Sequence, residues 1–126
     1  MRFLITGGGG FIGRNLIEWL TRQPSCEIRV LDNFSTGERE HLDDLNLDVI
    51  AGDIRDLNTV SKAMVGIDTV IHLAADTSVV NSIENPNFNF DVNALGTLNL
   101  LSAAKKNTDI LLLSAVTVLC QPSAAV

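Results

Sequence analysis

The stretch LITGGGGFIG, residues 4–13, joins a short apolar run to the start of a helical pattern through four consecutive glycines. We predict that Phe3–Thr6 forms a buried strand and that Gly7–Gly10 forms a turn. From Phe11 onward apolar residues recur at helical spacing, and Pro24 ends the helix that they predict. A strand, a glycine turn and a helix in this order decide the fold.

Glycines at such a turn have a physical reason that points to a bound pyrophosphate. The first permits a sharp turn, the middle one lets a phosphate approach the backbone, and the last lets the helix pack closely on the strand. Gly7, Gly10 and Gly13 fit the spacing GxxGxxG, whereas Gly8, Gly10 and Gly13 fit GxGxxG. The sequence leaves open whether Gly7 or Gly8 makes the first turn, and a purely structural turn is the alternative if the glycines are taken alone.

An acidic residue after the second predicted strand supports a dinucleotide site. That strand covers Ile28–Leu31, and Asp32 follows it directly. An acid about 20 residues beyond the last glycine accepts hydrogen bonds from the adenosine ribose of a bound dinucleotide. Because a carboxylate repels a 2′-phosphate, these two features together predict NAD as the cofactor in preference to NADP.

The rest of the chain alternates short apolar runs with helical patterns, which is typical of a doubly wound parallel sheet. The strands are apolar along their whole length, which indicates a sheet covered on both faces. We therefore predict an α/β, Rossmann-like fold of about five strands in the order 3-2-1-4-5. The further predicted elements are a loop over Asn33–Gly37, a weak helix over Glu38–Leu45, a strand over Asp48–Ala51, a helix from its N-cap Asp56 to Met64, a strand over Thr69–Ala74, a polar loop over Asp76–Asn87, a helix from Phe90 to Lys106 and a strand over Ile110–Leu113.

Length and composition restrict the classes of function. The 126 residues, 46% of them hydrophobic and 19% charged, suit one globular domain, residues 1–126. A net charge of −6 without a cluster of Lys or Arg argues against a nucleic-acid partner and against an anionic membrane surface. The sequence shows no bilayer-spanning run and no signal-peptide pattern, and Cys26 and Cys120 form no metal-binding pair. We expect a cytoplasmic protein without a metal site.

Five motifs in order resemble those of the extended short-chain dehydrogenases/reductases, and most closely those of the NAD-dependent nucleotide-sugar epimerases and dehydratases. The loop Asp32–Gly37 looks most like the UDP-glucose 4-epimerase branch. The motifs, within residues 1–113, are Thr6–Gly13, Leu31–Gly37, Gly52–Asp56, Ile71–Ala75 and Asn93–Leu101. The resemblance implies hydride transfer to and from NAD at the ring of a nucleotide sugar.

The resemblance also implies which residues hold the cofactor. Asp53 would accept from the exocyclic amine of adenine, and Asn93 would stabilise the middle of its helix near the active site. His72 is expected to be a packed, hydrogen-bonded residue rather than a catalytic base. Structural roles remain the alternatives: a helix N-terminal acid for Asp53, packing of small residues for Ala74 and Ala75, and a polar surface position for Asn93. The expected cofactor-binding residues are Gly7, Gly10, Phe11, Ile12, Gly13, Asp32, Asn33, Ser35, Thr36, Gly37, Asp53, Ile54, Leu73, Ala74 and Ala75.

The sequence departs from the family in its catalytic residues. The family's chemistry uses a Tyr and a Lys four residues apart, with a Ser or Thr at the end of strand five. This chain contains no tyrosine and no lysine at a matching position. The Ser or Thr position falls on Ala115 or Val116, unless a shifted register brings in Ser114 or Thr117. We expect no catalytic residue, no sugar-nucleotide-binding domain and no activity of the chain alone, so a nucleotide sugar would bind only a full-length parent. The alternatives are a stand-alone NAD-binding or sensing module and a subunit completed by another chain.

The C-terminal part of the chain predicts self-association. Ile110–Val126 carries no charged residue, and strand five would form an exposed edge that can pair with another chain. On the long helix, Leu95, Leu98 and Leu101 are expected to lack full cover. We expect a homo-oligomer, in its simplest form a symmetric pair. The alternative is a monomer in which Ala115–Val126 folds back as its own edge strand.

Overall fold

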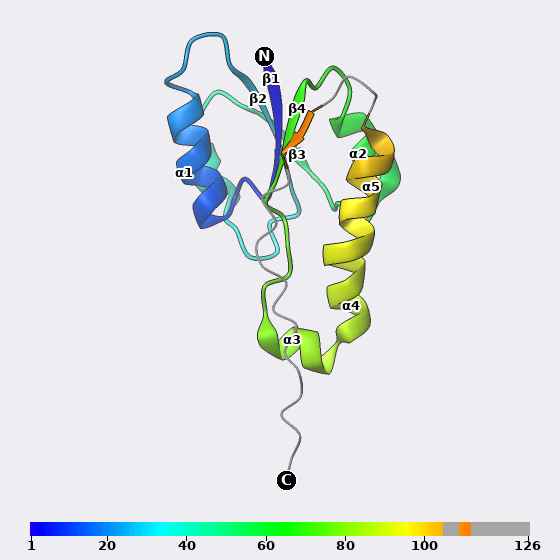
Figure 1. The fold of residues 1–126 in the computed structure, drawn as a ribbon. Helices are drawn as coiled ribbons and strands as arrows, with labels where there is room; N and C mark the ends of the chain where they lie inside the picture. Colours follow the sequence, from blue (N-terminus) through cyan, green and yellow to red (C-terminus); the bar gives the residue numbers. More distant parts are fainter. Residues whose placement is uncertain (105–108, 112–126) are drawn as a thin grey trace.

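The computed structural model describes residues 1–104 and 109–111. In it, parallel strands form one sheet in the order β3-β2-β1-β4-β5 (Figure 1), which confirms the predicted fold class and strand order. The strands are β1 (Arg2–Thr6), β2 (Glu27–Asp32), β3 (Asp48–Ala51), β4 (Thr69–His72) and β5 (Asp109–Leu111).

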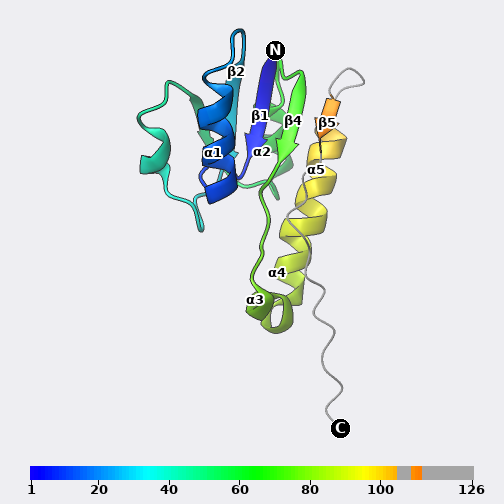
Figure 2. The same ribbon diagram turned by 60° about the vertical axis from the view of Figure 1, so that its left-hand side comes forward.

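Helices cover both faces of this sheet. Helix α1 and the turn η1 lie on one face, and α2 and α5 lie on the other (Figures 1 and 2). The helices are α1 (Phe11–Leu20), α2 (Leu57–Ala63), α3 (Val79–Glu84), α4 (Pro86–Phe90) and α5 (Gly96–Ala103), with a 3-10 turn η1 (Arg39–Leu42) and a π-helical turn η2 (Asp91–Leu95).

The central strands are apolar at consecutive positions because each face of the sheet carries its own core. Neighbouring residues of a strand point to opposite faces. Leu4 and Leu31 belong to the core beneath α2 and α5, whereas Ile5 and Val30 belong to the core beneath α1. All four side chains are fully buried. The two-sided cover that was predicted from the sequence is confirmed.

The segment after β4 is more helical than predicted. The stretch Asp76–Asn87, predicted as a polar loop, contains α3 and the start of α4. The Ser78 hydroxyl caps α3 by accepting from the Asn81 N–H at 3.1 Å. Pro86 is the first residue of α4, a position where its missing N–H leaves no helix hydrogen bond unmade. The helix predicted to begin at Phe90 therefore begins at Pro86 and passes through η2 into α5 (Figure 2).

Two other predicted elements are shorter in the structure. β4 ends at His72 because its neighbour β1 ends at Thr6, and the next N–H, that of Leu73, donates to the Thr6 carbonyl at 3.0 Å. The weak helix predicted over Glu38–Leu45 is only the turn η1, in which Leu42 is the buried residue.

Several predictions about the C-terminal part lie outside the described residues. They are the helix end at Lys106, the last two residues of the strand predicted to reach Leu113, the strand-end positions 114–117 and the fold of residues 115–126.

The carboxyl ends of the central strands meet at one edge of the sheet. Thr6 pairs with Leu31 of β2 and with His72 of β4, and Asp32 pairs with Ala51 of β3. This is the edge toward which the strand arrows point in Figure 1. Ligands of open α/β sheets bind outside this edge.

Candidate functional site

Gly7 makes the first turn after β1. Its φ of +72° lies in the left-handed region, and a Cβ there would lie 2.6 Å from the backbone nitrogen of Ala74. A Cβ on Gly8 would instead press on the side chain of Val30, at 2.6 Å from Cγ1. Both positions exclude a side chain, but only Gly7 of these two needs the unusual backbone conformation. The spacing GxxGxxG is therefore the relevant one.

The other two glycines of this spacing have different surroundings. A Cβ on Gly13 would lie 2.4 Å from the Gly7 carbonyl oxygen, so α1 packs directly on the turn. A Cβ on Gly10 would meet only that same oxygen, at an ordinary 3.4 Å, so the space beside Gly10 is otherwise open.

The N-terminus of α1 opens beside Gly10. Gly10 is its N-cap residue, and no side chain caps the helix. The N–H groups of the first turn, including those of Phe11 and Ile12, have no intrahelical partner, and the positive end of the helix dipole lies with them. The side chains of Phe11 and Ile12 are exposed, at 86% and 58%. This arrangement suits a phosphate group.

Asp32 lies at the end of β2 with its carboxylate against the glycine turn. Oδ2 accepts from the Gly9 N–H at 2.8 Å, and Oδ1 accepts from the Phe34 N–H at 2.8 Å. The residue is only 9% exposed. The carboxylate is thus held in one orientation beside the uncapped helix.

The loop after β2 closes over the same turn. Asn33 Oδ1 accepts from the Ser35 N–H at 3.1 Å, which folds the loop back on itself. A Cβ on Gly37 would lie 2.5 Å from the carbonyl carbon of Gly9, so the two glycine backbones are in direct contact. Ser35 and Thr36 are exposed between these points. The loop therefore lies directly beside the glycine turn.

Asp53 follows β3 and carries a carboxylate that protein donors surround. It accepts from the Arg55 N–H at 2.8 Å, from Arg55 Nε at 3.0 Å and Nη2 at 2.7 Å, and from Asn33 Nδ2 at 3.0 Å. The hydrogen bonds from the Arg55 side chain are the main cause that lowers the pKa of Asp53 to about 2. The N-cap of α2 is Asp56, which accepts from the Asn58 N–H at 3.0 Å. Asp56 is thus the N-cap residue that was predicted from the sequence. The role of helix N-terminal acid, which was the alternative for Asp53, belongs to Asp56 instead.

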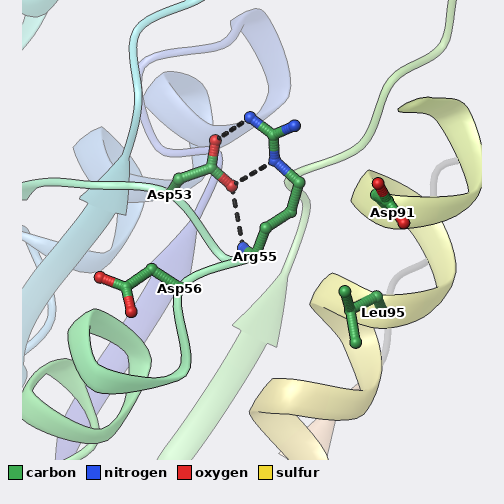
Figure 3. A pocket seen from close by; sticks show the side chains of 5 residues that line it. All are labelled: Asp53, Arg55, Asp56, Asp91 and Leu95. Atoms are coloured by element: carbon green, nitrogen blue, oxygen red, sulfur yellow. Dashed lines mark hydrogen bonds and ion pairs between the residues drawn. The ribbon is translucent and has the colours of Figure 1, made fainter. Parts of the chain in front are cut away.

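A cavity of about 410 Å3 lies between this loop and the helical segment α4–α5 (Figure 3). The Arg55 guanidinium, which binds Asp53, also lies over the Phe88 ring at 4.8 Å from its centroid. The cavity is lined by Asp53, Arg55, Asp56, Asp91 and Leu95.

Ile54 is buried, with 5% of its surface exposed. Its side chain packs in the core, and a Cβ on Gly96 of α5 would lie 2.5 Å from its Cδ1. The buried amide of Asn99 donates from Nδ2 to the carbonyls of Ile54 at 3.0 Å and of Arg55 at 2.9 Å. Ile54 therefore presents only backbone groups to a ligand.

The residues after β4 adjoin the glycine turn. The N–H groups of Leu73 and Ala74 both donate to Thr6 Oγ1, at 3.2 Å. Leu73, Ala74 and Ala75 are partly exposed at the carboxyl edge. A Cβ on Gly7 would lie 2.6 Å from the Ala74 nitrogen, so the backbones of the two segments are in close contact.

His72 joins the ends of β1 and β4 to α5. Its Nδ1 lies 2.6 Å from Thr6 Oγ1, and its Nε2 lies 3.0 Å from Thr97 Oγ1. Thr97 donates to the Asn93 carbonyl at 2.7 Å, so its oxygen accepts from Nε2–H and leaves Nδ1 to accept from Thr6. Burial lowers the pKa of His72 to about 4, so the ring is neutral near pH 7. The predicted packed, hydrogen-bonded histidine is confirmed.

Asn93 lies in η2 and binds the segment after β4. Its Oδ1 accepts from the Asp76 N–H at 2.8 Å, and its Nδ2 donates to the Asp76 carbonyl at 2.9 Å. Asn93 lies in the middle of the helical segment from Pro86 to Ala103, and both ends of its side chain tie this point of the segment to Asp76. Because its amide is partly buried and makes these two hydrogen bonds, Asn93 is not the polar surface residue that was the alternative.

Sequence reasoning found the glycine turn, Asp32 and the loop after β2, which the structure brings together. Asp53 joins them through Asn33, whereas the Ile54 side chain faces the core. Sequence reasoning missed the contacts made by Asn99 and by Thr6 and Thr97, the threonines beside His72. The signal for Asn99 was a polar residue at helical spacing from the small or apolar residues Gly96 and Ala103.

Among residues 1–104 and 109–111, no cluster of three or more His, Cys, Asp or Glu side chains is placed to hold a metal ion. No helix in this described part is both long enough and apolar enough to cross a bilayer.

Known proteins match this sequence over most of its length. The sequence profile of the GDP-mannose 4,6 dehydratase family matches residues 4–118. The dTDP-glucose 4,6-dehydratase of Mycobacterium tuberculosis is 37% identical over 111 residues, which cover 85% of this chain and 34% of that protein. The putative UDP-glucose 4-epimerase of Methanocaldococcus jannaschii is 36% identical over 104 residues, which cover 82% and 33%. The chain spans about a third of the length of these curated relatives.

Solved structures match the fold as well as the sequence. The UDP-glucose 4-epimerase of Thermus thermophilus, determined in complex with NAD, superposes with a TM-score of 0.76 at 43% identity, over 82% of this chain and 33% of that one. The UDP-glucose 4-epimerase of Thermotoga maritima superposes with a TM-score of 0.81 at 30% identity, over 89% and 37%.

Proposed function

Because this chain belongs to the family of NAD-dependent nucleotide-sugar epimerases and dehydratases, we propose that it binds NAD(H) at the carboxyl edge of its sheet. The chain corresponds to the N-terminal part of those enzymes. The residues present fit the cofactor. The space beside Gly10 is open and no side chain caps the N-terminus of α1, and the carboxylate of Asp32 lies next to this glycine turn. The pyrophosphate would bind the first-turn N–H groups of α1.

The position of Asp32 carries this proposal. Its carboxylate is nearly buried, is oriented by the Gly9 and Phe34 N–H groups, and lies beside the uncapped helix. A carboxylate at this place accepts hydrogen bonds from the adenosine ribose hydroxyls. It would face a 2′-phosphate with like charge, so NAD(H) is preferred over NADP(H).

The adenine end would lie toward the loop after β3. Asp53 would accept from the exocyclic amine, and the Ile54 backbone would contact the ring edge, since its side chain is buried. Asn33 already joins this loop to the one that borders the glycine turn, at 3.0 Å from Asp53. Ser35, Thr36 and Gly37 would border the adenosine.

The nicotinamide end would lie along Leu73, Ala74 and Ala75, beyond the end of β4. When bound, NAD accepts a hydride from the sugar ring and returns it. The residues of this chain bind and orient the cofactor, and the buried His72, held between two threonines, fixes the strand ends that support it.

Titration calorimetry with NAD+ and NADP+ tests the proposal. We expect the chain to bind NAD+ more tightly, and Asp32→Ala to weaken NAD+ binding by about 1.5–3 kcal/mol, the range for a hydrogen bond to a charged group. Asp44→Ala, which removes an exposed acid outside the site, is the matched control and should change nothing. Equal affinity for the two cofactors, or no loss in Asp32→Ala, would refute the assignment of Asp32.

We further propose that the 126-residue chain alone does not turn over a nucleotide sugar. It contains no tyrosine, so the family's Tyr-x-x-x-Lys pair is not in it. General acid–base catalysis by such a group contributes about 10²–10⁴-fold to the rate. Epimerisation or dehydrogenation of a nucleotide sugar above a no-protein control, abolished by Gly10→Val, would contradict this expectation.

A further inference from the structure

Asn99 is a buried polar residue that belongs to neither the glycine turn nor the strand ends. It lies on α5, is 8% exposed, and stands 45 and 44 residues from its two partners in sequence, Ile54 and Arg55. Its Nδ2 donates one hydrogen to the Ile54 carbonyl at 3.0 Å and the other to the Arg55 carbonyl at 2.9 Å. One amide group thus satisfies two consecutive carbonyls of a segment with no regular secondary structure.

This segment is held from the other side by the acid that it carries. Arg55 donates to Asp53 through its backbone N–H, Nε and Nη2. The position of the Asp53 carboxylate therefore depends on the backbone at Arg55, and that backbone depends on Asn99. Gly96, one turn before Asn99, lets α5 approach closely, since a Cβ there would lie 2.5 Å from the Ile54 side chain.

We propose that Asn99 is a positioning residue for adenine recognition, holding the Asp53–Arg55 segment so that the Asp53 carboxylate meets the exocyclic amine. This inference rests on the proposed binding of NAD and adds to it a residue that contacts no cofactor atom. Loss of the two bonds frees both carbonyls, and the carboxylate is no longer held at a fixed place.

The ratio of the dissociation constants for NAD and for an analogue without the exocyclic amine measures this role of Asn99. Nicotinamide hypoxanthine dinucleotide carries a carbonyl oxygen where NAD has the amine and an N–H where adenine has its bare N1, and is otherwise identical to NAD. The unmodified chain should bind NAD about tenfold or more tightly than the hypoxanthine analogue, because one charge-assisted hydrogen bond is exchanged for an unfavourable contact. In Asn99→Leu the ratio of the two dissociation constants should fall to about one to threefold. General loss of stability weakens both ligands alike and leaves this ratio unchanged.

Ser102→Ala is the matched control on the same helix. The residue is exposed, and among the described residues its hydroxyl donates to the Leu98 carbonyl of its own helix, at 2.7 Å. It should keep the full ratio. If Asn99→Leu does not fold, Asn99→Ala carries the same test, because the smaller side chain leaves room for a water at the two carbonyls.

The outcomes separate the two proposals. A chain that binds neither dinucleotide overturns the proposed function and this inference with it. A chain that binds NAD and its analogue equally overturns the contact of Asp53 with the amine and the inference with it, while the binding of NAD stands. Asn99 variants that keep the unmodified ratio overturn the inference alone. A ratio that falls in the Asn99 variants and stays high in Ser102→Ala supports it.

Discussion

Gly7 and Gly10 lie three residues apart in one turn and are glycines for different reasons. Gly7 has a positive φ, and any Cβ there would clash with the Ala74 backbone. Gly10 has an ordinary extended conformation, with φ −77° and ψ 169°, and its missing Cβ faces open space. The first glycine therefore serves the fold, and the second serves the ligand.

Alanine at these two positions should separate stability from binding. Gly7→Ala should destabilise the chain by about 1–3 kcal/mol or more, because it combines a strained φ with a backbone clash. Gly10→Ala should leave the melting temperature unchanged and weaken NAD binding about tenfold, since its Cβ occupies the phosphate's approach.

Thermal unfolding and calorimetry on both variants check this pair. A Gly10→Ala chain that binds NAD normally would show that the phosphate lies elsewhere. A Gly7→Ala chain with unchanged stability would contradict the role given to the positive φ.

At the scale of single residues, the sequence predicts those residues whose role follows from their neighbours along the chain. The glycines and Asp32 follow a strand or open a helix, so position along the chain indicates where they lie. Asn99 acts on residues 45 and 44 positions away, and such contacts appear only once α5 has packed on the sheet. For the same reason, His72 was predicted to be hydrogen-bonded but its partners Thr6 and Thr97 were not.

At the scale of elements, the strand ends are fixed by one chain of hydrogen bonds. Thr6 at the end of β1 accepts from two N–H groups beyond β4 and donates to His72, which donates to Thr97 on α5. Each donor has an acceptor only while the His72 ring is neutral, because a protonated ring would offer a second N–H to a hydroxyl that already accepts twice.

Acid should therefore destabilise the fold through His72. Its folded pKa of about 4 lies below the ordinary 6.5, so its contribution to stability is complete above pH 6.5 and is lost as the pH falls toward 4. The full loss is about 3 kcal/mol. Urea unfolding at several pH values should show this decline, and His72→Gln, which does not titrate, should flatten it. A parallel decline in both chains between pH 6.5 and 4 would assign the effect to other groups.

The elements themselves were predictable where they are long or apolar. All strands of the sheet and the helix after the glycine turn follow from apolar runs and their spacing. Helix α3 did not, because it is short and has no buried residue, and its only signals are the cap at Ser78 and the proline at the start of α4.

At the scale of the whole molecule, the site is assembled from segments that the sheet order brings together. The order β3-β2-β1-β4 places the ends of all four strands at one edge, with the glycine turn near the centre. This order was predictable because parallel strands joined by right-handed crossovers leave few arrangements.

Among the described residues, one apolar surface is exposed along the helical segment that ends in α5. Leu95, Leu98 and Leu101, at the end of η2 and on α5, are 37%, 56% and 52% exposed, which bears out the expectation that they lack full cover. They recur at helical spacing and so form one apolar stripe, and such stripes mark interfaces. We predict that the chain self-associates through this stripe, as a symmetric pair.

Light scattering over a range of concentrations should therefore give a mass above the 13.6 kDa of a single chain. Leu98→Glu places a charge in the stripe that becomes buried on pairing, so it should shift the chain toward monomer. Trp19→Glu is the control, because it adds the same charge at a 57% exposed apolar position on α1, on the opposite face of the sheet. A single species at 13.6 kDa at every concentration would show that the stripe drives no pairing. Dissociation by both substitutions alike would show that the effect of Leu98→Glu is not specific to the stripe.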